Sequence, residues 1–541
     1  MSFRWYFFNL IACFSIIFNP LLSQSIFQKN IIGKGGNDIP TSLIPLPNGN
    51  SFMIGNTNSW GFGLTDGFLI KLNTNGDTIF AKNIGDLGDD YFYSIIKTKN
   101  TPHFYICGQT NSFGANDIDG LLLKIDTLGN IIWSYRAKSI YINSIHSICE
   151  LTNGNIAFCG NIQTETGGND IWVGVIDTSC SVSWLATYGG NYFDYGYKIA
   201  PTTDGGVVIC GQTQSFRASE PDAYLLKIAS DGQLKWTFTI GLEDIGFFTC
   251  AIEMANGNIL AVGSIKESID KKSDILLVNL KTDGTLIYAK TLGAKNSETI
   301  TSLQTTSDSG FILSGSAEGV VRENNNYGML LKLNKNADFQ WATAYGAGIY
   351  SQNIYSACEL SDGTYLGVGQ KPASKPEDND IWLVKTSSQG ITKCSQPDYF
   401  PSFNQKDFII GTGGRMISDS TSIFIPITPQ SIYFPIEYKT ICANNLNMPT
   451  SLDSQKEIKI YPTYLNKTDK LIIDYSTNSN EQFLNENPTK LVEIIDINGK
   501  VIFYSTFHKN SQLNISNLSS GMYFCRVLIE NRLYSQKIIV E

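Results

Sequence analysis

Short apolar runs separated by polar turns recur along most of the chain with a constant period. Seven times, an apolar run closes on a glycine and a second apolar run opens about ten residues later. The openers follow one another every 51 to 53 residues, and they are Asp66, Asp119, Asp170, Asp222, Asp274, Tyr327 and Asp380. The runs are short and rich in β-branched residues, and no helical periodicity lies between them. This period predicts a repeat architecture built from β-strands.

The two ends of the repeat predict how the architecture closes. A large aromatic residue stands fourteen residues after each of the first six openers, but the seventh opener is followed by Cys394. Near the N-terminus, Phe27 has the same spacing to the next repeat glycine that Phe80 has to its own. Residues 25–32 are therefore expected to supply the missing fourth strand, which removes open sheet edges. The sequence predicts an all-β fold: a seven-bladed β-propeller over residues 25–394, closed by its N-terminal strand.

The repeated side chains have structural roles in this interpretation. The aspartate openers are expected to cap the turn before the third strand, because six catalytic carboxylates in equivalent places make little chemical sense. The aromatic residues are expected to fill the space between neighbouring blades. Lysines five residues after an opener are expected to hold their ammonium groups in water, and they are Lys71, Lys124, Lys227, Lys332 and Lys385. The strands resemble the blade repeats of bacterial extracellular β-propellers, and this resemblance implies no particular ligand.

The N-terminus carries an export signal. Residues 1–24 have Arg4 near their start, followed by a largely apolar stretch and by Ser23 beside the expected cleavage site. This order is typical of a secretory signal peptide, and the apolar stretch is short for a transmembrane helix. We therefore expect an exported protein with no transmembrane span.

The C-terminus carries a second targeting signal. Residues 455–541 alternate strands with an Asn-Gly turn, which predicts a small antiparallel β-sandwich. The motif residues are Tyr461, Pro462, Asn498, Gly499, Leu518, Gly521, Tyr523 and Lys537. This ordered set resembles the type A C-terminal sorting domain of type IX secretion cargo, although Thr463-Tyr464 stand where the family usually has Asn-Pro. The resemblance implies passage through the periplasm, type IX secretion machinery as a partner, and a protein that is secreted or held on the Bacteroidota outer-membrane surface.

Residues 395–454 separate the two domains and alternate Ile, Phe and Tyr with Ser and Pro. They fit either strands packed beneath the propeller or a semi-rigid connector, and the sequence leaves both interpretations open. Cys394 and Cys442 flank this connector and form the one candidate disulfide. The cysteines that directly precede repeat glycines would lie about a blade apart, which is too far for a bridge.

Composition narrows the range of partners. The net charge is −9, charged residues make up only 16%, and no basic block is present, so nucleic acid is not expected as a partner. The eleven cysteines include no CxxC pair, so the usual spacing of a zinc site is missing. Calcium is the remaining metal option, because the loops 86–90 and 116–119 concentrate oxygen ligands without the EF-hand order. No cofactor is expected.

The sequence assembles no catalytic set. It has three histidines, His103, His146 and His508. A Ser-His-Asp triad built on His146 is conceivable, but no serine is singled out as its partner. No pair of acids has a spacing that selects it for glycoside hydrolysis.

The long loops between second and third strands share one face with the connections between blades. This face gathers aromatic and acidic candidates for a ligand site, namely Trp60, Phe62, Asp89, Asp90, Tyr91, Phe113, Tyr192, Asp194, Phe216 and Tyr350. Aromatic rings beside amides and carboxylates on a rigid ring suit sugar or protein recognition. A purely structural role, in which these aromatics cap the blades, is the alternative.

The leading hypothesis is a non-catalytic module that binds an extracellular glycan or a surface protein. One alternative is a propeller-type polysaccharide hydrolase or lyase that uses Asp89, Asp90 or Asp194 at the mouth of the ring. Another is a structural or adhesion component of the cell surface. Propellers host all three functions, so the fold alone does not separate them.

Overall fold

The computed structural model describes the chain in two stretches. The first is residues 26–444 except 116, 166, 217–220, 244, 267, 269–271, 347–349, 373–377, 393, 395, 398, 405, 407 and 435. The second comprises residues 456–461, 464–465, 470–477, 491–496, 501–506, 511–514, 518–529 and 532–540. The expected signal peptide, residues 1–24, lies outside the described residues. The chain divides into two compact units, one ending at Ala443 and one beginning at Asn444.

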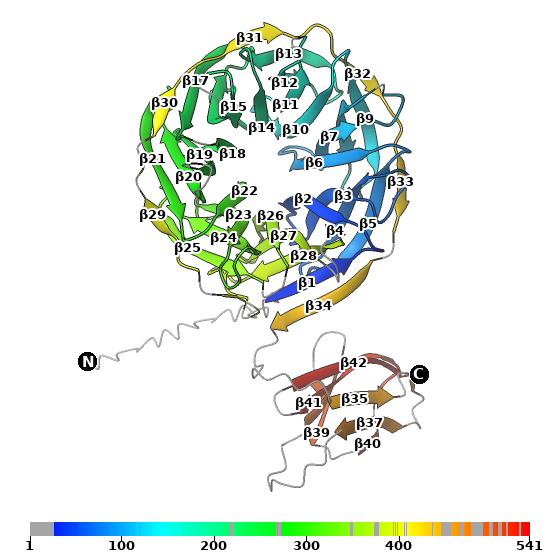
Figure 1. Ribbon diagram of the computed structural model, residues 1–541. Coiled ribbons are helices and arrows are strands. Elements are labelled where there is room, and N and C mark those ends of the chain that lie inside the picture. The colour runs from blue at the N-terminus through cyan, green and yellow to red at the C-terminus, as the bar shows by residue number, and fades with distance from the viewer. Residues whose placement is uncertain are drawn as a thin grey trace, which may run out of the picture. The chain divides into compact units, whose positions relative to one another are not determined.

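Seven antiparallel sheets, the blades, stand around the axis of the first unit (Figure 1). Blades 1 to 3 comprise β2 (Asp38–Pro45), β3 (Ser51–Thr57), β4 (Asp66–Leu72) and β5 (Thr78–Gly85); β6 (Asp90–Lys97), β7 (Phe104–Thr110), β8 (Asp119–Ile125) and β9 (Ile131–Lys138); and β10 (Asn143–Glu150), β11 (Ile156–Gln163), β12 (Asn169–Ile176) and β13 (Val182–Gly189). Blades 4 and 5 comprise β14 (Asp194–Pro201), β15 (Val207–Thr213), β16 (Asp222–Ile228) and β17 (Leu234–Gly241); and β18 (Gly246–Glu253), β19 (Ile259–Lys266), β20 (Ser273–Leu280) and β21 (Leu286–Gly293). Blades 6 and 7 comprise β22 (Glu298–Thr305), β23 (Phe311–Glu318), β24 (Asn326–Leu333) and β25 (Phe339–Tyr345); and β26 (Asn353–Glu359), β27 (Tyr365–Pro372), β28 (Asn379–Thr386) and β1 (Ile26–Ile32).

The N-terminal strand closes the ring. β1 pairs antiparallel with β28, and Phe27 lies opposite Lys385. Blade 7 therefore takes its fourth strand from the other end of the propeller sequence, and the predicted seven-bladed ring with N-terminal closure is confirmed.

The repeated aromatic residue and the repeated turn glycine meet across five of the seven blade interfaces, and Cys180 and Ala337 replace the glycine in the other two turns. A Cβ on Gly232 would lie 3.2 Å from the Trp184 ring, and one on Gly390 would lie 2.5 Å from the Trp341 ring. These glycines have positive φ, 87° and 74°, so they leave room for the ring and also make the turn. The aromatics thus fill the interfaces between blades, as the sequence predicts.

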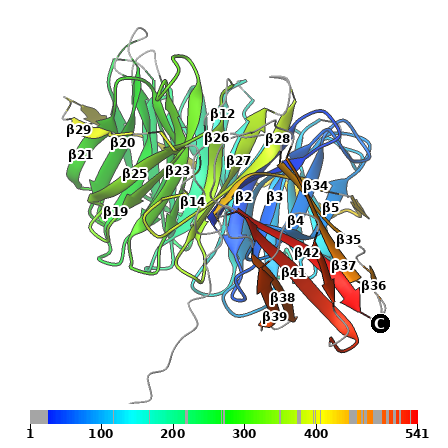
Figure 2. The same cartoon turned by 90° about the horizontal axis from the view of Figure 1, so that it is seen from below.

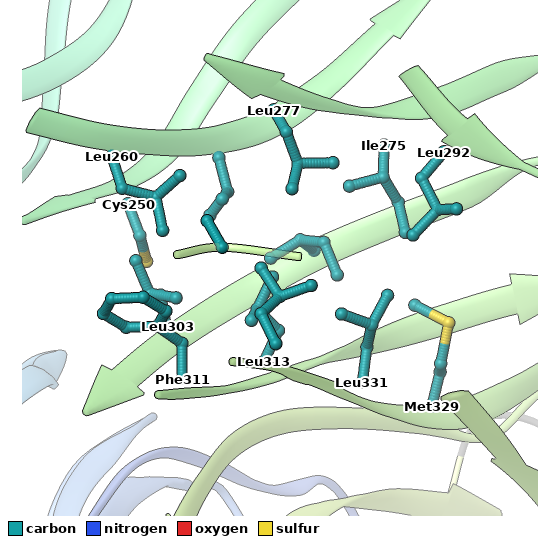
Figure 3. Packing of buried hydrophobic residues seen from close by; sticks show 14 of the residues in the cluster. Cys250, Leu260, Ile275, Leu277, Leu292, Leu303, Phe311, Leu313, Met329 and Leu331 are labelled. Carbon is teal, nitrogen blue, oxygen red and sulfur yellow. The ribbon is translucent and has the colours of Figure 1, made fainter. Parts of the chain in front are cut away.

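Each pair of neighbouring blades encloses its own apolar core. Figure 3 shows the core between blades 5 and 6, where Leu260 and Leu277 face Leu313 and Leu331 across the interface. All four side chains have no exposed surface. Packing of this kind between successive blades is the main source of stability in a propeller.

The expectation that the repeat lysines hold their ammonium groups in water is wrong for three of them. Lys227, Lys332 and Lys385 are buried, and their Nζ atoms lie 2.9, 2.9 and 3.1 Å from carboxylate oxygens. The carboxylates belong to aspartates in the turn between first and second strands, Asp204, Asp308 and Asp362. The lysine therefore ties two parts of one blade together.

Residues 402–444 form a belt around the outside of the propeller. Its strands are β29 (Ser402–Asn404), β30 (Ile409–Gly411), β31 (Arg415–Ser418), β32 (Ile423–Pro426), β33 (Gln430–Tyr433) and β34 (Glu437–Asn444). They add a fifth strand to blades 5, 4, 3, 2, 1 and 7 in that order, so the belt runs backwards relative to the blades. Figure 1 shows these strands on the perimeter, and Figure 2 shows β29 beside β21. This segment is β-structured, but its strands lie on the outer edges of the blades rather than beneath them.

Side chains of the belt, and of the residues that precede it, pack against the interfaces between blades. Phe424 stacks on Trp172 with a centroid distance of 6.4 Å, and Tyr433 meets Phe80 edge-on at the same distance. Eight apolar side chains in all contact the seven interface cores, and they are Tyr399, Phe408, Met416, Phe424, Ile427, Phe434, Ile436 and Ile441.

A disulfide joins the two ends of the belt. The Sγ atoms of Cys394 and Cys442 are 2.07 Å apart and the Cα atoms 5.9 Å apart. The eight other described cysteines are free and buried. The disulfide therefore closes the chain around the ring on the side where β34 pairs with β1.

The second unit contains two sheets. One has the order β35 (Lys456–Tyr461), β37 (Lys470–Thr477), β40 (Ser511–Asn514), and the other β36 (Tyr464–Leu465), β42 (Arg532–Val540), β41 (Gly521–Ile529), β38 (Leu491–Asp496), β39 (Val501–Thr506). Leu471 and Leu513 of the first sheet share a buried cluster with Val492, Ile494 and Cys525 of the second. The pairing is antiparallel except between β36 and β42, which are parallel.

Candidate functional site

The residues predicted to form a ligand site do not gather in one place. Trp60 packs on Phe434 of the belt at a centroid distance of 5.3 Å, with the Lys34 ammonium 4.4 Å from its ring. Phe216 packs on Tyr224 at 5.5 Å and contacts the interface core of blades 3 and 4. Both rings are half-buried against the outer part of the propeller, so they act as packing residues there.

Two further predicted aromatics belong to loops of the propeller. Phe113 is half-buried and has a positive φ of 55°. Phe62 is half-buried, and its backbone N–H donates to Asp66 Oδ2 at 2.6 Å, as does that of Gly63 at 3.3 Å. Asp66 thereby caps the loop before its strand, which is the role the sequence predicts for an opener. Tyr350 is exposed.

The acids proposed for the mouth of the ring divide by burial. Asp90 and Asp194 have no exposed surface and accept hydrogen bonds from serine hydroxyls, Ser112 at 2.9 Å and Ser215 at 2.6 Å. Thr213 donates to the second oxygen of Asp194. Burial raises the pKa of both carboxyls. These two acids therefore hold loops in place, and their carboxylates are not presented to a substrate.

Asp89 remains near the surface. It is half-buried, and its backbone and side chain face Asn111 of the neighbouring loop, with Nδ2 of Asn111 3.5 Å from its Oδ2. Of the three acids named in the hydrolase hypothesis, Asp90 and Asp194 are thus buried, and Asp89 lies near the surface.

Asp90 and Asp66 meet inside the junction between blades 1 and 2. A Cβ on Gly85 would lie 1.9 Å from Asp66 Oδ1 and 2.9 Å from Asp90 Oδ2, so only a glycine leaves room for both carboxyls. The same arrangement recurs around Gly189, with Asp170 and Asp194. Burial, with a smaller contribution from the neighbouring acid, raises the pKa of Asp66 and of Asp170 to about 6. Sequence periodicity shows the openers but not these partners, because each partner comes from the next blade.

Aromatic side chains on two inner strands, together with that of the residue before β14, form two stacks that we jointly call the aromatic wall. It consists of Phe193, Tyr195 and Tyr197 on blade 4 and of Tyr91 and Tyr93 on blade 2. The rings on blade 4 stack nearly parallel at centroid distances of 6.2 and 6.5 Å, and those on blade 2 stack at 6.4 Å. Residues two apart on a strand point to the same side, which explains the spacing.

The wall is partly open to solvent at the end near the long loops. Phe193 is 38% exposed and its neighbour Tyr192 63%, whereas the tyrosines of the wall are half-buried. The hydroxyl of Tyr195 lies 3.4 Å from Asn169 Nδ2, and that of Tyr91 lies 3.4 Å from Thr65 Oγ1. The wall therefore combines flat apolar surface with polar groups at its outer end. Of the predicted site residues, Tyr91 belongs to this wall, and the exposed Tyr192 directly precedes Phe193 in the chain.

His146 on blade 3 joins the two halves of the wall. Its ring meets Tyr93 edge-on at 5.4 Å, and its Nδ1 lies 3.1 Å from the carbonyl oxygen of Gly196, between Tyr195 and Tyr197. Nδ1 therefore carries the proton, and Nε2 accepts the hydroxyl of Ser144 at 2.9 Å. Burial lowers the pKa of His146 to about 4, so the ring is neutral at neutral pH.

The Ser144–His146 pair resembles half of a catalytic triad, but the repeat explains it structurally. Thr41 and Thr301 stand at the equivalent bulge of blades 1 and 6, and each donates to a carbonyl of the next blade at 2.9 Å. His146 makes the same connection from blade 3, with a backbone carbonyl where a triad has a carboxylate. The pair thus links the inner strands of neighbouring blades by hydrogen bonds.

Two acids of the loops expected as calcium candidates, Asp119 and Asp86, have partners within the protein. Asp119 forms a buried ion pair with Arg136. In the other loop, Asp86 N donates to Asp90 at 2.9 Å, and Asp86 Oδ1 accepts from Gln430 of the belt at 3.2 Å. Across the described part of the chain, no group of three or more His, Cys, Asp or Glu is placed to hold a metal ion. Calcium binding at these loops stays a prediction.

The structure describes five of the eight residues of the sorting motif. Tyr461 ends β35, Gly521 opens β41, and Lys537 lies in β42, while Leu518 and Tyr523 join the buried cluster of the second unit. The hydroxyl of Tyr523 donates to the carbonyl of Ser519 at 2.9 Å. Pro462, Asn498 and Gly499 lie outside the described residues.

Comparison with known families bears on the second unit. Residues 459–541 match the family model described as "Secretion system C-terminal sorting domain". This confirms the resemblance to type IX secretion cargo: the protein is a β-propeller with a sorting domain, and it is secreted or displayed on the cell surface. Within the residues described, no helix is long and apolar enough to cross a membrane.

Comparison with individual proteins adds little about the propeller. No curated protein matches the chain. An extracellular domain of a two component system from B. thetaiotaomicron is similar at 13% identity and a TM-score of 0.38, over 96% of this chain and 58% of that one. The polysaccharide lyase Uly1 is similar at 9% identity and a TM-score of 0.40, over 67% of this chain and all of that one. This chain thus spans little more than half of the first structure, and likenesses this low carry no argument about function.

Proposed function

We propose that this exported propeller is a non-catalytic module that binds a neutral segment of an extracellular glycan on its aromatic wall. The observation that carries the proposal is the wall itself: five aromatic rings on rigid inner strands, with tyrosine hydroxyls beside Asn169 and Thr65 at the outer end. Flat rings suit the apolar faces of sugars, and hydroxyl and amide groups suit their rims. Rigid strands keep the rings in place, which limits the entropy lost on binding.

The arrangement of the acids favours binding over catalysis. A hydrolase or lyase needs an acid that can exchange protons with its substrate. Asp90 and Asp194 are fully buried, and His146 donates to a backbone carbonyl as threonines do in other blades. Asp89 is the one acid of the predicted set that stays near the surface.

A glycan array and a turnover assay on the same polysaccharides test the proposal. The purified protein should bind at least one neutral glycan without degrading it. Tyr195→Ala should weaken that binding about tenfold, equivalent to ~1.4 kcal/mol, because it removes the middle ring of the blade 4 stack. Tyr195→Phe should keep most of the affinity. Tyr433→Ala, a change to an exposed tyrosine on the belt, is the matched control and should have no effect.

Three outcomes would count against the proposal. Turnover that disappears in Asp89→Asn would support a hydrolase or lyase. Binding that Tyr433→Ala weakens as much as Tyr195→Ala would place the ligand elsewhere. The absence of both glycan binding and turnover would favour a structural or adhesion role.

A further inference from the structure

Two hollows of the propeller lie on the face opposite the long loops, where first and second strands are joined by short turns. A cleft of about 440 Å³ opens between blades 1 and 2, with Leu46, Pro47, Lys71, Lys97, Lys99 and Phe104 among its lining residues. A second hollow of about 530 Å³ lies at the ends of the inner strands of blades 1, 2, 6 and 7. Both are lined by Leu46, Pro47 and Lys97, so together they form one groove, the short-turn groove.

The groove lies at a junction where two positions of the repeat carry other residues than they do at three other junctions. At three other junctions the inner strand ends in glutamate, and that carboxylate accepts the backbone N–H of a turn in the preceding blade. The distances are 2.7 Å for Glu150 and Lys99, 2.6 Å for Glu253 and Thr203, and 2.5 Å for Glu359 and Ser307. These contacts close the junctions by connecting one blade to the next.

The junction between blades 1 and 2 has neither partner of this contact. Pro47 stands at the turn position and has no N–H, and Lys97 stands where three other blades carry glutamate. The turn of blade 2, from Thr98 to His103, is also one residue longer than its counterparts. A closing contact is thus replaced by an open cleft, and a negative charge by a positive one.

The walls of the cleft are cationic and its floor is apolar. Lys97 and Lys99 are exposed, and Lys71 is half-buried with its Nζ 2.9 Å from the carbonyl oxygen of Thr127. Leu46 and Phe104 are buried beneath them. Glu150 accepts the backbone N–H of Lys99, and Glu359, which lines the second hollow, accepts the backbone N–H of Ser307. Three ammonium groups around one cleft make a local positive region on a chain whose net charge is −9.

We propose that the short-turn groove binds an acidic glycan through its uronate or sulfate groups, at a site separate from the aromatic wall. Lysine ammonium groups are compact charges that suit carboxylate and sulfate oxygens. An acidic polysaccharide is favoured over nucleic acid because the protein is exported and because the aromatic ring at this site, Phe104, is buried and offers no stacking surface for a base. The site is independent of the neutral-glycan function proposed above.

Calorimetric titration of the protein with polygalacturonate and with dextran sulfate tests this proposal, with neutral dextran as the reference polymer. Binding to at least one acidic polymer is expected at low salt and should weaken as salt rises, because exposed charges are screened. Lys97→Glu restores the residue found at this position in three other blades, so it should fold, and it should weaken binding at least tenfold. Lys335→Gln changes an exposed lysine in a turn of blade 6 and is the matched control, expected to stay within twofold.

The outcomes separate the two sites. Tyr195→Ala should leave acidic-polymer binding intact, and Lys97→Glu should leave neutral-glycan binding intact. The groove proposal is overturned if Lys97→Glu binds acidic polymers as well as the unaltered protein, or if Lys335→Gln is equally impaired. It is also overturned if neutral dextran binds as tightly, or if inorganic sulfate saturates the site at the same concentration of charged groups.

Discussion

Replacing Cys394 and Cys442 together with serine should loosen the belt at one end only. Cys394 lies eight residues after the end of β28 at Thr386, so the beginning of the belt stays attached to blade 7 without the disulfide. The other end is held by the pairing of β34 with β1, and β1 is itself the N-terminal strand. The belt should therefore peel from β34 backwards, while its middle strands β31 and β32 stay anchored by Met416 and Phe424.

The size of the effect follows from the length of chain that the disulfide closes. The two cysteines are 48 residues apart. The chain-entropy estimate for a loop of this length is about 4 kcal/mol at 25 °C, and it is an upper value because engineered and native disulfides often contribute less. A factor of ten in an opening equilibrium corresponds to about 1.4 kcal/mol, so opening of β34 should become up to about a thousandfold more frequent.

Hydrogen exchange measured segment by segment checks this prediction. Amides of β34 and β1 should exchange much faster in the double variant, and those of β31 and of the inner strands should change little. A thiol reductant should produce the same pattern in the unaltered protein and no further change in the variant, since the other described cysteines are free thiols with no disulfide to reduce. Unchanged exchange in β34, or an equal increase throughout the propeller, would refute the reasoning.

Two further predictions concern the lysine–aspartate pairs and the sorting domain. Burial alone would raise the pKa of Asp308, but hydrogen bonds from Thr306 and Lys332 outweigh it and lower that pKa to about 2. A lowered carboxyl pKa adds stability above the unfolded pKa of about 4 that is lost as pH falls through about 2. Asp308→Asn should thus lower the free energy of unfolding at pH 7 by about 1 kcal/mol, a discounted value because Asp308 is half-exposed, and chemical denaturation should show the difference vanishing near pH 2. Deleting residues 458–541 should leave the propeller folded but held in the periplasm, and surface exposure equal to that of the full chain would contradict this.

The sequence by itself determined the blade count, the closure and the export route. A blade is a local unit, so its alternation of apolar and polar residues and its turn residues repeat in register along the chain. The position of Phe27 relative to that register was enough to assign β1 to blade 7. The sorting motifs are likewise local, and their order alone matched the family.

Only the tertiary structure revealed the belt, the aromatic wall and the short-turn groove. The belt strands contain three to eight residues, most of them too short to show an alternation, and their partners are more than a hundred residues away along the chain. The wall and the groove combine residues from neighbouring blades, so Tyr93 and Tyr197, or Pro47 and Lys97, are about one or two repeats apart in sequence. The burial of Asp90 and Asp194 was also hidden, because the serine hydroxyls that cover them come from loops 22 and 21 residues further along the chain.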